Sequence, residues 1–420
     1  MNSKSNHIIL INFDFPPNYG IGGRRWGKFA KELATLKIHV HVIKAEKKDN
    51  RNSHWTKDVD SEFIHVYELK RKAELDRWRV GIGILDKITY KIALAFNKWL
   101  DKGTPFDLAI GCQSQINQYL DKITSQFPIE WIIATGAPFN LTYFAAEYVK
   151  HSQKLKLWVD LRDPWLDAQN YGMLGLSEKR KKAEEAKALS VITNSSVVSC
   201  PTIDALQIFK TITSQNIDHK LFELRHFYDP SDYVKTSLER PKNKIKIVYG
   251  GDIYIDSEKH IHKLVSDLKS LQQTHPLVYQ MLDFRFFSDT IFKVKNLFEN
   301  LEVIRLEKSI GNRIFEEISS CDWCMILLSD FNKNFFTTKY FEYQPYNKPY
   351  LYLGPNGMVF NEISKEGIGM DWSQFYKNLT TNDQLELKSF VPKQASRKGS
   401  IQERTKDLLE RMGYASNSNL

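Results

Sequence analysis

Short β-rich runs alternate with amphipathic helical runs along most of this 420-residue chain, and no other feature constrains its fold as strongly. Such alternation is typical of α/β proteins, in which helices connect the strands of open parallel sheets. Strands are expected at residues 7–15, 39–45, 62–70, 106–111, 130–138, 156–164, 190–195, 221–227, 245–252, 281–288, 301–307, 324–329 and 349–354. Helices are expected at residues 25–36, 84–100, 141–150, 177–189, 201–213, 256–271, 290–299, 309–319, 338–345 and 396–414. We therefore predict an α/β fold.

One segment interrupts this pattern. Residues 230–244 carry many polar side chains and no hydrophobic period, which is typical of a linker. After it the alternation restarts with a strand that ends in two glycines. We therefore expect a first domain over residues 1–229 and a second over residues 245–395, joined by this linker.

A glycine-rich loop between the first strand and the first helix is a candidate binding site. In the stretch FPPNYGIGGRRWGKFAKEL (15–33), Gly22 and Gly23 are followed at once by Arg24 and Arg25. Glycine lets the backbone approach a ligand closely, and a helix start with arginines favours an anion such as phosphate. The glycine spacing differs from the dinucleotide fingerprint G-x-G-x-x-G. The alternative is a surface turn with solvated arginines.

The second half has a similar turn, in which Gly251 ends a strand and Lys259 lies in the next helix. Further along, Lys339 and Glu342 are three residues apart and therefore share one face of a predicted helix. A carboxylate among the aromatic residues around Glu342 needs polar partners, such as sugar hydroxyls or a cation. The alternatives are a plain strand-to-helix connection and a partly exposed Lys–Glu pair.

A charged cluster ends the strand at residues 156–164. Asp160, Arg162 and Asp163 follow one another there, within the sequence LWVDLRDPW. In open α/β sheets, ligands bind at the carboxyl ends of strands, so this cluster is a candidate for ligand binding or catalysis. The alternative is an internal ion-pair cluster that holds the following loop.

Charge and cysteine content narrow the choice of partners. The net charge of +9 favours anionic partners, but the basic residues are spread along the chain and do not choose among metabolites, nucleic acid and membrane. Of the four cysteines, only Cys321 and Cys324 form a CxxC, and no second ligand pair has zinc-site spacing. We expect buried reduced thiols, no metal and a cytoplasmic location. The sequence also shows no signal peptide and no apolar window of about 18 residues that could span a membrane.

A basic and apolar run occupies residues 68–100, with Ile84, Ile88, Ile92 and Phe96 at helical spacing. The favoured interpretation of this stripe is the core-facing side of an ordinary domain helix. The alternative is a helix that lies on an anionic membrane surface, because basic residues accompany the stripe.

Taken together, these motifs resemble bacterial retaining glycosyltransferases of the family-4 type, within a polysaccharide-assembly subgroup. The resemblance rests on FPPNYGIGGRRWGKFAKEL, WIIATGAPFN, WVDLRDPW, RHFYDP, IVYGGDIY and TTKYFEYQPYNKPYLYLG, in this order along the chain. It implies the GT-B fold, in which two Rossmann-like, doubly wound domains face a cleft. It also implies an N-terminal acceptor domain, a C-terminal nucleotide-sugar donor domain and a last helix, within 396–420, that crosses back to the first domain.

The resemblance further implies roles for individual residues. Glu342 would bind the ribose hydroxyls of the donor. The diphosphate of the donor would meet backbone and cations from both domains, namely Gly22, Gly23, Arg24, Arg25, Gly251, Lys259 and Lys339.

This chain departs from the family pattern at two positions. Asn334 stands where many members have a glutamate that contacts the transferred sugar. Asn140 follows the TGAP sequence where many members carry a histidine, and an asparagine there binds a sugar by hydrogen bonds but cannot act as a general base. The candidate catalytic residues are therefore Asn140, Asp160, Arg162 and Asp163.

The resulting expectation is a metal-independent, retaining transfer of a sugar from a nucleotide-sugar donor to a glycan or polyprenyl-linked acceptor in surface polysaccharide assembly. No cofactor is needed because the nucleotide sugar is the substrate, no nucleic-acid partner is expected, and peripheral contact with an anionic membrane at its inner face is consistent with this role. One rival is a nucleotide-sugar epimerase of GT-B fold, which would convert the donor alone. The other is a non-catalytic binder of anionic glycans or nucleic acid, whose binding would weaken strongly with salt.

Overall fold

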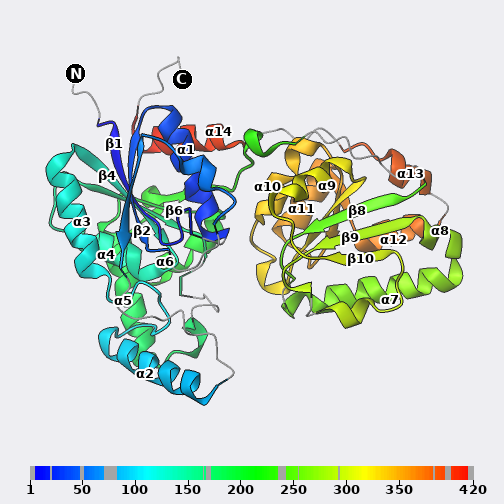
Figure 1. Cartoon of the computed structure of the whole chain (residues 1–420), viewed down its shortest axis with the longest axis horizontal. Coiled ribbons are helices and arrows are strands. Elements are labelled where there is room, and N and C mark those ends of the chain that lie inside the picture. Colours follow the sequence, from blue (N-terminus) through cyan, green and yellow to red (C-terminus); the bar gives the residue numbers. More distant parts are fainter. Residues whose placement is uncertain are drawn as a thin grey trace. The chain divides into compact units, whose positions relative to one another are not determined.

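A computed structural model describes residues 5–18, 21–47, 52–70, 83–163, 165–166, 172–234, 243–253, 255–291, 294–381, 384–392 and 399–414. The chain forms two compact units, and each contains one sheet (Figure 1). Unit 1 comprises Met1–Arg225 and Arg404–Leu420, and unit 2 comprises His226–Glu403. Most of the predicted linker, residues 235–242, lies outside the described residues.

Unit 1 contains a seven-stranded parallel sheet with the order β3-β2-β1-β4-β5-β6-β7. Its strands are β1 (His7–Ile11), β2 (His39–Ala45), β3 (Ile64–Leu69), β4 (Ile129–Gly136), β5 (Lys156–Leu161), β6 (Val197–Cys200) and β7 (Leu221–Glu223). The chain builds outward from β1 to β3, and then returns to place β4 on the other side of β1. The order of the strands therefore reverses between β1 and β4, which is the topological switch point of this sheet.

The described helices of unit 1 are α1 (Arg24–Thr35), α2 (Ile84–Leu100), α3 (Gln113–Gln126), α4 (Phe139–Val149), α5 (Glu178–Asn194), α6 (Ile208–Thr211) and most of α14 (Ile401–Arg411). All of them except α2 lie against the faces of this sheet (Figure 1). Helix α1 buries Trp26, Phe29 and Leu33, the face predicted from the sequence. Helix α3 packs on β2 and β3, and α4 packs on β4 and β5.

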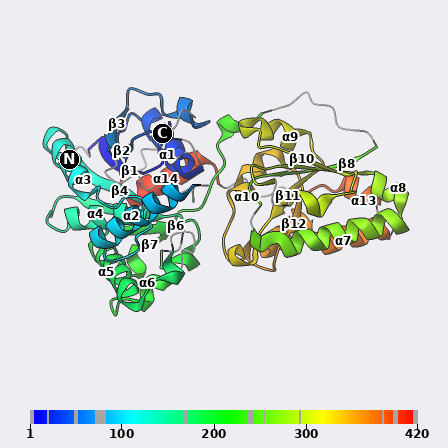
Figure 2. The same cartoon turned by 60° about the horizontal axis from the view of Figure 1, so that its bottom comes forward.

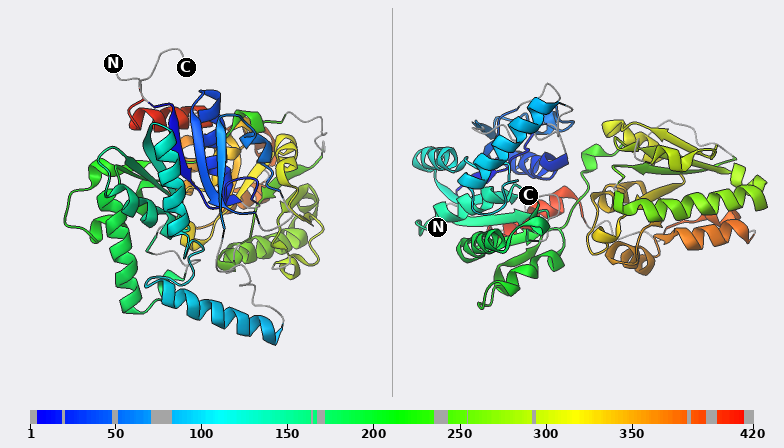
Figure 3. Two further views of the ribbon diagram at one scale, coloured as in Figure 1. Left: turned by 60° about the vertical axis from the view of Figure 1, so that its left-hand side comes forward. Right: turned by 90° about the horizontal axis from the view of Figure 1, so that it is seen from below.

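Helix α2 differs from the other helices of unit 1, because it extends away from the sheet (Figures 1 and 3). The apolar stripe of α2 was expected to face the core, and that expectation is wrong. Ile84 and Ile92 are 78% and 65% exposed, and Asn97 is the only buried residue of the helix. None of the helices in the described ranges combines the length and apolar character needed to cross a lipid bilayer.

Unit 2 contains a six-stranded parallel sheet with the order β10-β9-β8-β11-β12-β13. Its strands are β8 (Ile245–Gly250), β9 (Leu282–Phe287), β10 (Ile304–Glu307), β11 (Trp323–Leu327), β12 (Tyr350–Leu353) and β13 (Gly369–Asp371). The chain runs from β8 to β10 and then returns to place β11 beside β8. The switch point of this sheet therefore lies between β8 and β11.

Alternation along β8 separates two hydrophobic cores, as the period of two predicts for a strand covered on both faces. Ile247 and Tyr249 belong to one core and Val248 to the other. The first core includes residues of α7 (Glu258–Thr274), α8 (Pro276–Gln280), α12 (Trp372–Thr380) and α13 (Gln384–Ser389). The second includes residues of α9 (Ile314–Ser320), α10 (Thr338–Glu342) and α11 (Met358–Glu366). Figure 2 shows the sheet of unit 2 between α9 and α7.

Several sequence-based expectations differ from the structure. Residues 106–111 form turns rather than a strand. Residues 190–194 complete α5, and the strand follows them as β6. Residues 290–299 were expected to form a helix, but their described part contains the 3₁₀ turn η11 (Lys295–Phe298) and no α-helix. The elements that were not predicted include α3, α11, α12, α13 and β13. The two strand errors concern short apolar runs, for which periodicity does not separate helix from strand.

Candidate functional site

The five predicted donor-binding residues of unit 2 come from two connections at the switch point of its sheet. Gly251 directly follows β8, and Lys259 lies in the first turn of α7. Asn334 lies between β11 and α10, while Lys339 and Glu342 belong to α10. Because β8 and β11 are neighbours, these connections leave the sheet side by side, at the edge where open α/β sheets bind ligands.

Lys339 and Gly251 are in close contact. A Cβ atom at residue 251 would overlap Cε and Nζ of Lys339, so any other residue here would displace the end of this side chain. Gly251 also has a φ of 145°, a backbone conformation that favours glycine. Its own N–H donates to the carbonyl oxygen of Phe287 (2.9 Å). The Gly251 N–H is therefore already used within the sheet, the glycine provides space for Lys339, and its approach to a diphosphate stays a prediction.

The Lys339 ammonium is partly buried above this turn. Its Nζ lies 5.5 Å from the ring centroid of Tyr249 and, among the residues that the structure describes, forms no hydrogen bond or ion pair. Burial lowers the pKa of Lys339, while the charges of Glu342 and Asp252 act in the opposite direction. A cation with no bonded partner, beside open backbone at a switch point, is suited to bind an anion.

Glu342 lies one turn after Lys339 on the short helix α10. The Thr337 hydroxyl caps this helix by accepting from the Lys339 N–H (3.4 Å). Buried Tyr340, Phe341 and Tyr343 anchor the helix in the second core, and Glu342 remains partly exposed. Packing of the aromatic residues therefore positions both charged side chains at the same edge of the sheet.

Lys259 has a partner that was not predicted. It forms an ion pair with Asp330, which begins the 3₁₀ turn η13 (Asp330–Asn332) after β11. His260 Nε2 lies 3.1 Å from the same carboxylate. The hydrogen bond from Lys259, followed by that from His260, holds the pKa of Asp330 below its usual value. An anion at Lys259 would therefore compete with Asp330, whereas no carboxylate of the described residues forms an ion pair with Lys339.

Asn334 is exposed in the turn between η13 and α10. Its place at the carboxyl end of β11 agrees with a role near a ligand, which stays a prediction.

In unit 1, Arg25 and Asp160 form a buried ion pair that joins α1 to β5. Arg25 donates from Nε to the Asp160 carboxylate (2.8 Å) and from Nη2 to the Leu224 carbonyl oxygen (2.5 Å). Trp26 Nε1 (2.8 Å) and Ser199 Oγ (2.7 Å) donate to the same carboxylate. Asp160 is completely buried and Arg25 nearly so. We therefore correct two assignments, because both side chains are buried and bonded to each other and to neighbouring parts of unit 1.

Gly22 and Gly23 pack against Asp14, in the loop that follows β1. A Cβ atom at Gly23 would overlap the carbonyl oxygen of Asp14. A Cβ atom at Gly22 would overlap the Asp14 carboxylate and lie 3.1 Å from the Arg162 guanidinium. Close packing of the loop therefore accounts for both glycines without a ligand, and their role at a diphosphate stays a prediction.

The other charged residues predicted at the carboxyl edge of the unit 1 sheet, Arg24, Arg162 and Asp163, differ in how exposed they are. Arg24 is buried, with its Cζ 6.0 Å from the ring centroid of Trp55. Arg162 and Asp163 are partly exposed after β5, and the Arg162 N–H donates to the Gly136 carbonyl oxygen (3.0 Å). Arg162 and Asp163 are thus the members of the predicted cluster that remain accessible.

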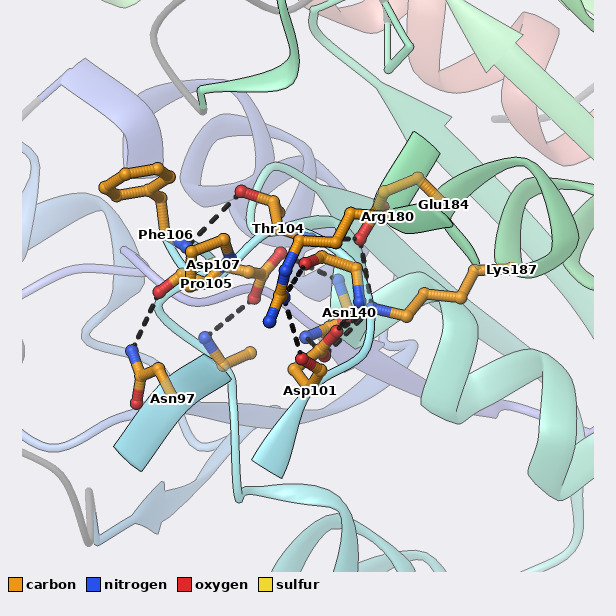
Figure 4. A network of polar contacts seen from close by, with 12 residues as sticks. Asn97, Asp101, Thr104, Pro105, Phe106, Asp107, Asn140, Arg180, Glu184 and Lys187 are labelled. Carbon is orange, nitrogen blue, oxygen red and sulfur yellow. Dashed lines mark hydrogen bonds and ion pairs between the residues drawn. The ribbon is translucent and has the colours of Figure 1, made fainter. Parts of the chain in front are cut away.

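Asn140 belongs to a buried polar network at the first turn of α4 (Figure 4). Its Nδ2 donates to Asp101 (2.8 Å), and its Oδ1 accepts from Lys187 Nζ (2.8 Å). Its N–H donates to Asp107 (3.0 Å). Since both ends of the amide are used and the residue is 1% exposed, we correct its assignment as a catalytic residue. It connects α4 to the loop after α2 and to α5.

Sequence reasoning missed the charged members of this network. Burial, reinforced by Glu184, raises the pKa of Asp107 to about 6, although the N–H groups of Asn140 and Ala109 and the charge of Lys187 oppose the rise. Burial acts to lower the pKa of Lys187, but the carboxylates of Glu184 and Asp101 raise it. These residues are up to 86 positions apart, so no spacing in the sequence indicates their contact.

A cavity of about 640 Å³ lies elsewhere in unit 1. Its lining comes from α3, from the end of α4 and from the amino ends of β4 and β5, and includes Asn117, Glu147 and Leu155. The candidate residues lie at the opposite, carboxyl ends of the strands. The cavity is therefore not part of the candidate site.

No protein-family model matches this chain, and no curated protein sequence matches it. Solved structures match it over almost its whole length. A glycosyltransferase from Rickettsia africae ESF-5 is 14% identical, with 99% of this chain and 100% of that chain covered and a TM-score of 0.58. A protein structure from E. coli, described as trehalose-6-phosphate bound with UDP-2-fluoro glucose, is 10% identical in sequence. The match covers 97% of this chain and 99% of that chain, with a TM-score of 0.63.

A putative UDP-N-acetylglucosamine 2-epimerase from Listeria monocytogenes is 11% identical, with 97% of this chain and 96% of that chain covered and a TM-score of 0.52. Identities this low show a shared fold and do not choose between transfer and epimerisation. Together with the two parallel sheets, they confirm the predicted fold class. The chain has the GT-B fold, with two Rossmann-like α/β domains.

Proposed function

We propose that the protein is a glycosyltransferase that moves a sugar from a nucleotide-sugar donor to a glycan or lipid-linked acceptor. The observation that carries this proposal is the Lys339 ammonium, which has no bonded partner in the described residues and lies above Gly251 at the switch point of unit 2. A diphosphate at this place would receive a cation that the described part of the protein does not pair with a carboxylate.

The proposed chemistry follows from the charge that develops on the leaving group. The acceptor hydroxyl oxygen forms a bond to the anomeric carbon while the bond from that carbon to the diphosphate oxygen breaks. The hydroxyl proton passes to an oxygen of the departing diphosphate on the same face, so the configuration is retained. Lys339 would stabilise the negative charge on the diphosphate, which makes a metal ion unnecessary in this proposal. Glu342 would bind the ribose hydroxyls.

The finer assignment is to the polysaccharide-assembly subgroup of the family-4 type, acting in the cytoplasm on a polyprenyl-linked acceptor at the inner face of the membrane. Its support is the ordered set of sequence segments, above all TTKYFEYQPYNKPYLYLG. In the structure this segment contains α10, which carries Lys339 and Glu342, and β12, beside β11 in the sheet.

A product assay separates this function from its rivals. The protein is incubated with UDP-, GDP-, ADP-, CMP- and dTDP-sugars, with and without lipid-linked or free glycan acceptors. Transfer predicts release of the nucleotide of the donor, a nucleoside diphosphate or, from a CMP-sugar, CMP, together with a glycosylated product, only when an acceptor is present. An epimer formed from the donor alone would support the epimerase. Salt-sensitive nucleic-acid binding without any nucleotide-sugar binding would support the non-catalytic binder.

The variant Glu342→Ala tests the proposed donor site. Loss of the charge-assisted hydrogen bonds to the ribose should weaken donor binding roughly 10- to 100-fold. The fold should survive, because Glu342 is partly exposed and the aromatic residues beside it keep α10 packed. Glu362→Ala, at a partly exposed position of α11, is the matched control and should bind the donor as the wild type does. Equal donor binding by both variants would remove Glu342 from the site.

A further inference from the structure

We propose that α2 is a membrane-docking helix that lies flat on an anionic lipid surface, with its apolar face inserted among the lipids. Its large apolar side chains are exposed along the whole helix. They are Ile84 (78% exposed), Leu85 (79%), Ile88 (49%), Ile92 (65%), Phe96 (46%), Trp99 (77%) and Leu100 (42%). A contiguous apolar face of this size on a folded protein marks an interaction site.

The residues of α2 are arranged as in an interfacial helix. At 3.6 residues per turn, Ile84, Ile88, Ile92 and Trp99 fall on one face. Lys87, Lys91 and Lys98 fall along one edge of that face, as the same geometry requires. In the residues that the structure describes, none of these three lysines forms an ion pair. This combination of an apolar face and a basic edge is the sequence signature of helices that bind anionic membranes.

The side of α2 that faces the protein is narrow. Tyr90, Ala93 and Leu94 are partly buried, and Asn97 alone is fully buried. In proteins most of the stability of a helix comes from packing of its apolar face, and α2 packs little of its surface on the described part of unit 1. The helix therefore needs a second surface to cover its apolar face.

The charged residues of α2 indicate that the surface which covers its apolar face is an anionic lipid membrane. The helix carries three lysines and a single acidic residue, Asp86, whose carboxylate accepts from the Gly83 N–H at the helix start (3.4 Å). Anionic headgroups are complementary to the lysine edge, while the aromatic rings of Phe96 and Trp99, which stack with centroids 6.0 Å apart, suit the interfacial region. Lipid therefore satisfies both the apolar and the charged parts of α2.

The buried network of Figure 4 attaches α2 to the rest of unit 1. Asn97 Nδ2 donates to the Pro105 carbonyl oxygen (2.8 Å), and Arg180 donates to the Lys98 carbonyl oxygen (3.0 Å). Asp101, which follows α2, accepts from Lys187 (2.7 Å) and from Asn140 in the first turn of α4. The last turn of α2 is thus fastened to the carboxyl end of β4.

The link between α2 and the carboxyl end of β4 matters for acceptor binding, if the proposed sugar transfer holds. A membrane contact at α2 would hold the carboxyl edge of the unit 1 sheet, where the acceptor is expected, next to the lipid surface. An acceptor carried by a lipid would then reach this edge without leaving the membrane. The docking itself does not depend on sugar transfer, so the two ideas can fail separately.

Vesicle binding tests the docking. The full chain is mixed with vesicles of phosphatidylglycerol and phosphatidylcholine, or of phosphatidylcholine alone, and bound protein is measured by flotation. The wild type should bind the anionic vesicles, and added salt should weaken the binding. The combined variant Ile88→Ser, Ile92→Ser and Trp99→Ser, and separately Lys87→Glu with Lys91→Glu, should each bind about tenfold more weakly or worse.

Two control variants test whether the loss of vesicle binding is specific to α2. Leu277→Ser changes a side chain of α8 that is 79% exposed, and Lys269→Glu changes an exposed lysine of α7. Both controls should bind vesicles as the wild type does. Thermal unfolding of all variants should match the wild type, because every substituted residue of α2 is exposed.

Two results would overturn the proposal. One is failure of the wild type to bind anionic vesicles, or unchanged binding by the α2 variants. The other is a wild-type oligomer that becomes monomeric in the apolar variant without any vesicle binding, which would assign the face to a second copy of the chain.

Discussion

Lys339 of α10 lies directly over Gly251 in the turn after β8, at a distance that leaves no room for a Cβ atom on residue 251. The variant Gly251→Ala should therefore displace the lysine and strain a backbone whose φ is 145°. We expect a loss of about 1–3 kcal/mol in the free energy of unfolding. We also expect weaker nucleoside diphosphate binding, because the ammonium moves. Chemical denaturation and calorimetric titration with UDP and GDP measure the two effects.

Gly175→Ala is the control for this substitution. A Cβ atom there meets nothing within 4 Å, so stability should stay equal or rise slightly. If Gly251→Ala behaves like Gly175→Ala in both measurements, the contact between Lys339 and the turn has no consequence for stability or binding.

Replacement of Lys339 by methionine should separate binding from stability. Burial lowers the pKa of Lys339, so the folded chain binds this proton less readily than the unfolded chain does. The ammonium therefore costs stability at neutral pH, and the cost fades as the pH rises through the folded pKa. We expect Lys339→Met to unfold at equal or higher denaturant concentration than the wild type, with the difference shrinking at alkaline pH. A clear loss of stability would show that Lys339 serves the fold.

Loss of the ion pair between Asp160 and Arg25 should lower the stability of the fold, in contrast to the replacement of Lys339. Asp160→Asn leaves the buried Arg25 guanidinium without its counter-charge, and such changes cost about 3–5 kcal/mol. Asp163→Asn, three residues later and partly exposed, should change the free energy of unfolding by less than about 0.5 kcal/mol. Denaturant unfolding of the two variants checks the contrast. Equal stability of Asp160→Asn and wild type would return Asp160 to the list of catalytic candidates.

Asp107 should make stability depend on pH. Burial raises its pKa from 3.8 to about 6, so the folded chain holds this proton more tightly than the unfolded chain. The protonated Asp107 therefore stabilises the fold. This contribution to the free energy of unfolding is fully present below about pH 4 and is lost as the pH rises through about 6, a change of about 3 kcal/mol. Asp107→Asn removes the titration, so its unfolding free energy should fall less steeply between these pH values. Parallel pH profiles of variant and wild type would contradict this prediction.

The sequence predicts the fold well because its main signal is periodic. Strands such as β1 and β11 are short apolar runs bounded by turns, and their alternation with helices indicates an open parallel sheet. The period also predicts the length of α2, but not that its apolar face is exposed. Burial depends on what packs against a helix, and no local pattern contains that information.

The candidate site is only partly predictable for a similar reason. Residues that directly follow a strand, such as Gly251, are placed by topology alone, because the carboxyl ends of parallel strands share one edge. Arg25 and Asp160 look like ligand-binding residues in the sequence, yet they bind each other across 135 positions. Likewise, Asp330 neutralises Lys259 through a contact that no motif indicates. The sequence predicts the edge of the sheet more reliably than the partner of each charge.

The most direct test of the account is calorimetric titration of UDP, GDP, ADP, CDP and dTDP into the wild type, Lys339→Gln and the control Lys269→Gln. The account predicts that one of these nucleotides binds the wild type and the control equally. It predicts binding to Lys339→Gln that is roughly 10- to 100-fold weaker, because a charge-assisted hydrogen bond is lost. Equal binding to all three proteins, or no binding of any nucleotide to the wild type, would contradict a diphosphate site at Lys339.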